Sequence, residues 1–78
     1  MRVRLFAALR ELAGSSWIEA AAVADVAALR RDLETRFGPR FEAIVAAGTV
    51  VVNGEPAGAG TALAPDDEVA LLPPVSGG

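Results

Sequence analysis

One long helix set between short strands is the pattern that most restricts the fold of this chain. Asp25 is a good N-terminal cap, because its side chain can accept a hydrogen bond from an unpaired backbone N–H and its charge suits the positive end of the helix dipole. Gly38 followed by Pro39 stops a helix in the usual way. Between these signals, apolar side chains recur along one stripe: Val26, Leu29, Leu33 and Phe37. The segment therefore predicts an amphipathic helix whose stripe packs in the core.

Short segments on both sides of this helix have the alternation or the β-branched residues that are typical of strands. The predicted strands are residues 2–9, 17–23, 49–52 and 68–72, with a short edge segment at 55–57. Asn53 and Gly54 predict a tight turn between two of them. Residues 41–45 favour a second, short helix that ends near Gly48, and Leu63 is the expected core anchor of the loop after the edge segment.

This order of elements predicts an α+β fold, a β-grasp in which a mixed sheet packs on one main helix. We expect the first and last strands to pair in parallel at the centre of the sheet. The helix then covers one face of the sheet and leaves the other uncovered. Strand alternation places Phe6, Val51 and Leu72 on the uncovered face, where an apolar cluster favours docking of a partner. Residues 1–78 form a single domain in this interpretation, with residues 73–78 as a C-terminal tail.

The last eight residues have a composition that suits a reaching tail. Pro73 and Pro74 donate no backbone N–H, so the last strand cannot continue past Leu72 and the chain leaves it extended. Gly77 and Gly78 lack a Cβ and can enter a channel too narrow for any other residue. The alternative is an ordinary frayed terminus, but a frayed end does not need a stiff proline pair. We therefore predict that Gly78 presents its carboxylate to another protein's active site. The residues that carry it there are Pro73, Pro74, Val75, Ser76 and Gly77.

Composition excludes several classes of function. The formal charge of −3 and the absence of a basic run argue against a nucleic acid partner. No apolar run approaches the length of a membrane span, and the first nine residues carry arginines instead of a signal-peptide core, so we expect no membrane partner and a cytoplasmic location. The chain has no Cys and no His, which removes thiolate chemistry and the commonest general base and metal ligand. We expect no metal site and no chemistry performed by a side chain.

Four segments carry a resemblance to a known family: residues 5–14, 26–33, 51–55 and 67–78. The last of them, which ends Leu-Pro-Pro-Val-Ser-Gly-Gly, is the most specific. The chain resembles the small, sulfur-carrying subunit of molybdopterin synthase, a ubiquitin-like β-grasp protein with a C-terminal Gly-Gly. It departs from that family at Asp66, where the family often has Gly, and in having no Lys.

The resemblance implies a sulfur carrier that binds no cofactor and is not active alone. An ATP-dependent activating enzyme would adenylate the carboxyl group of Gly78, which would then take up sulfur and become a thiocarboxylate. The large catalytic subunit of molybdopterin synthase would transfer that sulfur to a pterin precursor, on the way to the dithiolene of the molybdenum cofactor. Gly77 would thread into the partner enzymes together with Gly78.

Two alternatives stay open from the sequence. A sulfur carrier of the same fold that serves thiamine or cysteine synthesis also ends in Gly-Gly, although such relatives often lack the Pro-Pro-Val-Ser segment. A β-grasp adaptor or ubiquitin-like modifier would bind or conjugate without carrying sulfur. The mass of the intact protein would separate sulfur carriage from binding alone, and the large subunit that co-purifies would separate the two kinds of carrier.

Overall fold

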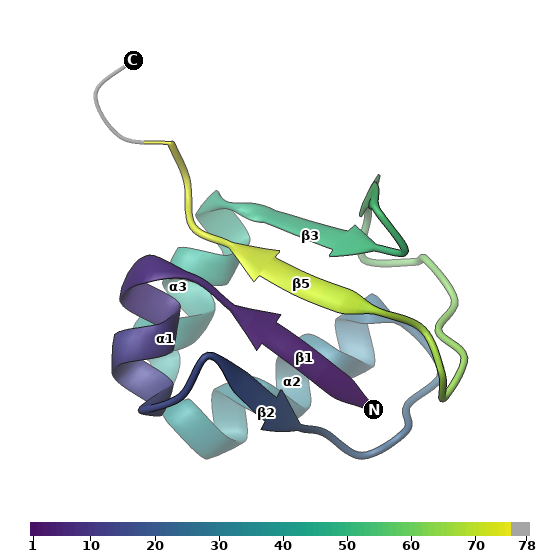
Figure 1. Cartoon of the computed structure of the whole chain (residues 1–78), viewed down its shortest axis with the longest axis horizontal. Coiled ribbons are helices and arrows are strands. Elements are labelled where there is room, and N and C mark those ends of the chain that lie inside the picture. The colour runs from purple at the N-terminus through teal and green to yellow at the C-terminus, as the bar shows by residue number, and fades with distance from the viewer. Residues whose placement is uncertain (76–78) are drawn as a thin grey trace.

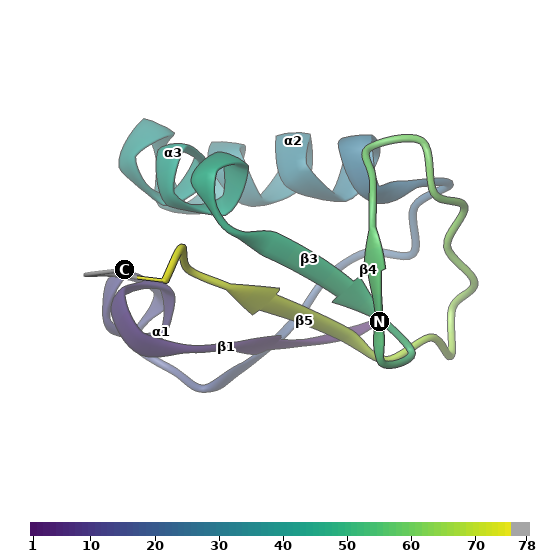
Figure 2. The same ribbon diagram turned by 90° about the horizontal axis from the view of Figure 1, so that it is seen from above.

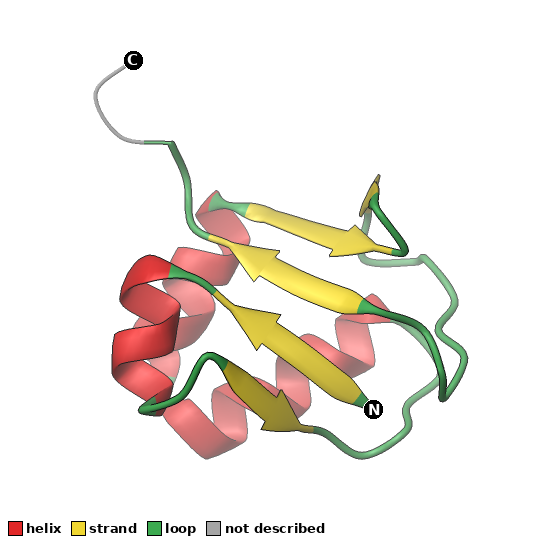
Figure 3. Ribbon diagram, viewed as in Figure 1, coloured by secondary structure: helices red, strands yellow, loops and turns green. Residues whose placement is uncertain are grey.

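The computed structural model describes residues 1–75, in which five strands and three helices are present (Figures 1 and 3). The strands are β1 (Arg2–Leu5), β2 (Trp17–Glu19), β3 (Thr49–Val52), β4 (Glu55–Ala57) and β5 (Val69–Leu72). The helices are α1 (Ala7–Ala13), α2 (Val26–Phe37) and α3 (Pro39–Ala47). None of these three helices has both the length and the apolar character needed to cross a bilayer. The predicted α+β class and the second helix are confirmed.

The strands form one mixed sheet in the order β2-β1-β5-β3-β4. β1 and β5 run parallel, with Val3 beside Val69, and the other neighbouring pairs are antiparallel. The predicted parallel pairing of the first and last strands at the centre of the sheet is therefore confirmed (Figure 1). Asn53 and Gly54 turn the chain from β3 into β4 with φ angles of 51° and 83°. This is the conformation that an Asn-Gly pair favours in a two-residue hairpin.

Helices α2 and α3 lie across one face of the sheet (Figure 2). α2 begins as predicted, because the Asp25 side chain accepts a hydrogen bond of 2.8 Å from the Ala28 N–H. Such a cap stabilises a helix by about 1 kcal/mol. α2 ends at Phe37, and Gly38 after it has a φ of 95°, which glycine adopts at low cost. Arg30 and Glu42 then join α2 to α3 through a half-buried ion pair.

The core lies between the sheet and the pair α2 and α3. Phe41 on α3 is the largest of the fully buried side chains in this core. Phe37, the last residue of the predicted α2 stripe, is half-buried and lies 4.9 Å from Phe41 between ring centroids. Leu63 packs against the same cluster, as predicted. The other buried apolar residues are Val3, Leu5, Leu9, Ala20, Val26, Leu29, Leu33, Val45, Val50, Val69 and Leu71.

The first strand is shorter than predicted. A strand over residues 2–9 is wrong, because β1 ends at Leu5 and α1 begins at Ala7. Alanine has little preference for strands and favours helices, so the two alanines before Leu9 join the helix formers that follow it. Leu9 is fully buried from α1 and closes one end of the core. Phe6 keeps an extended backbone at the junction, with φ of −124° and ψ of 150°.

Two other strand boundaries also differ from the prediction. The second strand was expected over residues 17–23, but β2 stops after three residues, where a run of alanines, which are poor strand formers, begins. Ala20 still donates a backbone hydrogen bond of 2.8 Å to the carbonyl of Met1. β5 begins at Val69 and not at Glu68. The Glu68 N–H donates instead to the side-chain oxygen of Asn53 at 2.9 Å.

Candidate docking face and tail exit

The sheet face opposite α2 and α3 is the candidate docking face (Figure 2). Alternation along β1 buries Val3 and Leu5 and exposes Arg2 and Arg4. The cross-strand register then aligns one outward residue from each strand in a single row: Trp17, Arg4, Ala70, Val51 and Pro56. An aromatic ring and a cation thus occupy the β2 and β1 side of this face, and apolar side chains occupy the β5, β3 and β4 side.

Phe6, Val51 and Leu72, the predicted interface residues, all lie on this face. Phe6 extends from the end of β1 and its ring lies 4.9 Å from the guanidinium carbon of Arg4. Val51 belongs to the row. Leu72 lies on β5 beside Thr49, two residues after Ala70. All three side chains are half-buried. Phe6 and Val51 line a shallow hollow of about 230 Å³, whereas Leu72 lies outside it. Their part in binding a partner stays a prediction.

Trp17 and Arg4 belong to this face although the sequence did not single them out. Trp17 is 39% exposed, and its ring centroid lies 4.3 Å from the guanidinium carbon of Arg2 and 5.4 Å from that of Arg4. The alternation of arginine with buried Val3 and Leu5 was a usable signal, since it places both arginines on the open face. Only the register of β1 against β2 shows that Trp17 lies opposite Arg4.

Gly48 determines where the chain leaves the sheet. It lies between α3 and β3, and a Cβ built on it would be 2.0 Å from the carbonyl oxygen of Leu72. The same Cβ would be 3.0 Å from the carbonyl carbons of Leu72 and Pro73. Only glycine allows this approach, so Gly48 lets the end of β5 lie close against the start of β3. Sequence reasoning assigned Gly48 to a helix end and missed this contact, because it joins residues far apart in the chain.

The described part of the predicted tail becomes more exposed from Pro73 to Val75. Pro73 is half-buried, Pro74 is exposed, and Val75 is 94% exposed. The chain runs away from the sheet at the carboxyl end of β5, on the same side as the end of β1 and far from the N-terminus (Figure 1). The remaining predicted tail residues, Ser76, Gly77 and Gly78, lie outside the described residues.

A polar clamp fixes the opposite end of β5. The Asp67 carboxylate accepts hydrogen bonds from the Ala64 N–H at 2.7 Å and from the Asn53 side chain at 2.9 Å. The Asn53 side chain in turn accepts from the Glu68 N–H. The backbone bond from Ala64, followed by that from Asn53, lowers the pKa of Asp67 from its ordinary value of 3.8. The clamp therefore ties the β3–β4 hairpin to the loop that enters β5.

The architecture and the family comparison define the class of this protein. A five-stranded mixed sheet with its first and last strands parallel at the centre, wrapped on a main helix, is the ubiquitin-like β-grasp fold. The model of the ThiS family matches residues 3–78, so the chain belongs to the ThiS family. Its identification as a ubiquitin-like sulfur carrier is therefore confirmed. No curated protein matches the sequence.

Several solved structures are similar over almost the whole chain. The crystal structure of SAMP1 from Haloferax volcanii is 38% identical, with 100% of this chain and 98% of that chain covered and a TM-score of 0.78. A putative molybdopterin converting factor, subunit 1, from Pyrococcus furiosus is 30% identical, with 95% of each chain covered and a TM-score of 0.77. The BexX/CysO complex of Amycolatopsis orientalis contains a match that is 26% identical, with 99% and 98% covered and a TM-score of 0.80.

Proposed function

We propose that this chain is the sulfur carrier subunit of a molybdopterin synthase and acts in the cytoplasm. The observation that carries the proposal is the tail exit. The central strand β5 ends beside Gly48, and Pro73, Pro74 and Val75 continue from it with increasing exposure next to the docking face. The sequence ending and the 30% identity to a putative molybdopterin converting factor subunit add support.

The reacting group in this proposal is the carboxyl group of Gly78, as the terminal group of the working protein. A carboxylate is a poor electrophile, so one of its oxygens first attacks the α-phosphate of ATP in the activating enzyme, and pyrophosphate leaves. Hydrosulfide then attacks the acyl carbon of the adenylate and displaces AMP, and a thiocarboxylate remains on Gly78. The chain has no Cys and no His, so the sulfur is held at this terminal acyl group and not on a side chain.

The partners supply the catalytic groups, and this chain supplies the acyl terminus and the surface that positions it. Phe6, Val51 and Leu72 dock on the activating enzyme and then on the large catalytic subunit. Pro73 to Ser76 span the distance to the active site. Gly77 and Gly78 enter its narrow part, where the large subunit transfers the sulfur to the pterin precursor. ATP is bound by the activating enzyme and not by this chain.

A carrier for cysteine or thiamine synthesis is the second candidate. The match to the ThiS family and the similarity to the BexX/CysO complex favour it. The 38% identity to SAMP1, which is described as a small archaeal modifier protein, favours a ubiquitin-like modifier as a third possibility. The three readings share the activated carboxyl terminus and differ in its acceptor.

The intact mass of the protein tests the proposal. Incubation with the activating enzyme, ATP and a sulfur donor is expected to replace one oxygen by one sulfur, at Gly78 and at no side chain. Addition of the large molybdopterin synthase subunit and the pterin precursor is expected to restore the original mass. Consumption of the sulfur only by a cysteine-forming or thiamine-forming partner would establish the second candidate. No mass change with any activating enzyme would contradict sulfur carriage.

A further inference from the structure

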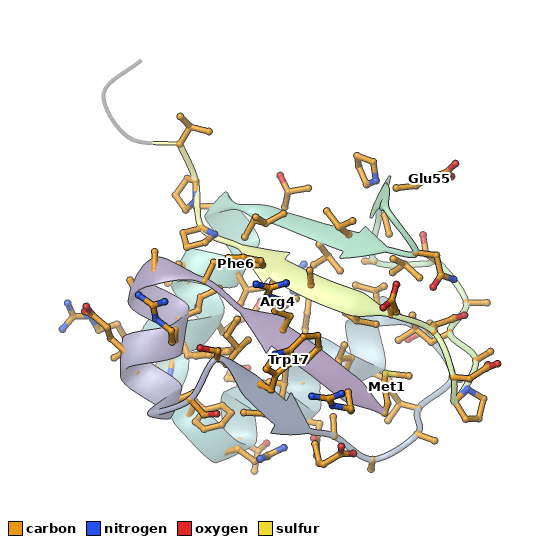
Figure 4. All side chains as sticks on the ribbon, viewed as in Figure 1. Met1, Arg4, Phe6, Trp17 and Glu55 are labelled. Atoms are coloured by element: carbon orange, nitrogen blue, oxygen red, sulfur yellow. The ribbon has the colours of Figure 1, made fainter. Side chains whose placement is uncertain are left out.

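Arg4 differs from Arg2, the other arginine of β1 on the docking face, because two aromatic rings and not one lie beside its guanidinium. The Arg4 side chain lies between Trp17 on β2 and Phe6 at the end of β1 (Figure 4). Its guanidinium carbon is 4.9 Å from the Phe6 ring centroid and 5.4 Å from the Trp17 ring centroid. The planar guanidinium is therefore fixed on the sheet surface by two rings, and little side-chain entropy is left to lose on binding.

The charge of Arg4 has no internal partner in residues 1–75. Arg30 pairs with Glu42, Arg2 lies 4.0 Å from Glu19, and Arg4 makes neither an ion pair nor a hydrogen bond in this part of the chain. Five N–H donors of its guanidinium are consequently available in a fixed fork, the geometry that matches a carboxylate.

Arg2, two residues earlier on the same strand and face, has a different environment. It lines a hollow of about 310 Å³ with four carboxylate residues: Glu19, Asp66, Asp67 and Glu68. The hollow beside Arg4 has one carboxylate residue in its lining, Glu68, and Arg4 and Glu68 do not form an ion pair. The other lining residues are mainly apolar and aromatic. Arg2 therefore has an exposed ion pair with Glu19 and further carboxylates around it, whereas Arg4 has no ion pair in residues 1–75.

A partner that covers Phe6 and Val51 must also cover Arg4, because all three line the same hollow. Removing an unpaired guanidinium from water is strongly unfavourable unless an anion takes the place of the lost water. The hollow of about 230 Å³ is smaller than the roughly 300–1,000 Å³ of usual small-molecule sites. Its size suits one side chain of a protein and not a separate ligand.

We infer that Arg4 is the charged anchor of the docking face and that it donates a bidentate hydrogen bond to an aspartate or glutamate side chain of the partner enzyme. This inference rests on the proposed function and adds to it a chemical requirement for the partner. The partner's acidic side chain is surrounded by an apolar patch of the partner, and this patch covers Phe6, Val51 and Leu72. A partner with only apolar groups at that position is rejected, because it buries the Arg4 charge without compensation.

Affinity for the large molybdopterin synthase subunit tests this role. Arg4→Gln is expected to weaken binding by at least about 30-fold, the loss typical of one partner of a buried charge pair. Arg4→Lys is expected to recover part of that loss, since it keeps the charge but not the fork. Arg2→Gln is the matched control on the same strand and face, and a change below about fivefold is expected because Arg2 already has an exposed ion pair with Glu19. Thermal melts of each variant are needed to show that it is folded.

The outcomes separate this inference from the proposed function. Equal losses for Arg4→Gln and Arg2→Gln, or a loss below about fivefold for Arg4→Gln, would overturn the anchor role while wild-type protein still gained sulfur and bound the large subunit. Wild-type protein that neither gained sulfur nor bound the large subunit would overturn the proposed function, and the anchor role with it. Binding by wild-type protein is also expected to weaken more steeply with added salt than binding by Arg4→Gln.

Discussion

Gly48→Ala is expected to destabilise the domain and to redirect its tail. The new Cβ would lie 2.0 Å from the carbonyl oxygen of Leu72, whereas close carbon to oxygen contacts are about 3.3–3.6 Å. The backbone segments around Gly48 and Leu72 must therefore separate by more than about 1 Å. The Leu72 carbonyl group belongs to the backbone and cannot rotate away as the end of a side chain can. Overpacking of this kind costs about 1–3 kcal/mol, and each kcal/mol lowers the Tm of a domain of this size by about 4–8 °C.

The cost arises from the contact and not from a positive φ, because the φ of Gly48 is −97°. Gly58→Ala is the matched control, because nothing lies within 4 Å of a Cβ at Gly58 and its φ is not positive. The assay combines thermal melts with the rate of thiocarboxylate formation at a temperature where every variant is folded. Gly48→Ala is expected to show a lower Tm and slower sulfur loading, and Gly58→Ala neither. A Tm for Gly48→Ala within about 1 °C of wild type would refute the close-contact argument.

Three further predictions use the same measurements. Deletion of Gly77 and Gly78 should abolish sulfur loading with little change in Tm, because terminal residues contribute little to a core; a large fall in Tm would contradict this. Phe6→Asp should weaken partner binding more than it lowers Tm, whereas Leu33→Asp should unfold the protein, since Leu33 is 1% exposed and a buried charge is costly; an equally unfolded Phe6→Asp would assign Phe6 to the core. The pKa of Asp67 is lowered on folding, so its contribution to stability is present above the ordinary value of 3.8 and is lost as pH falls through the folded pKa. Asp67→Asn should therefore remove part of the acid-induced loss of Tm, and an unchanged profile would count against the clamp.

Local signals explain which elements could be predicted from the sequence. Asp25 as a cap, Gly38 as a stop and the Asn-Gly turn at Asn53 each act within a few residues, and all three have the predicted roles. The boundary at Leu5 was missed because residues 6–9 fit a strand pattern almost as well as a helix. Burial of Leu9 decides between them, and that burial depends on the packing of α1 against the core.

The docking face was only partly predictable for a related reason. Alternation within a strand places Phe6, Val51 and Leu72 on the open side without knowledge of the neighbouring strands. The position of Trp17 opposite Arg4 requires the register between two strands. The role of Gly48 likewise depends on a contact with a residue far along the chain, which no local pattern encodes.

The position of β5 has a consequence for synthesis of the carrier. Although β5 is the last strand of the sheet to leave the ribosome, it lies in the middle and joins two pairs of strands, β2 with β1 and β3 with β4. Isolated pairs of strands are marginally stable in water, so the sheet cannot form before residues 69–72 have been translated. A chain released early would remain unfolded and would lack the docking face. Partner enzymes would therefore meet that face only on copies translated as far as the tail.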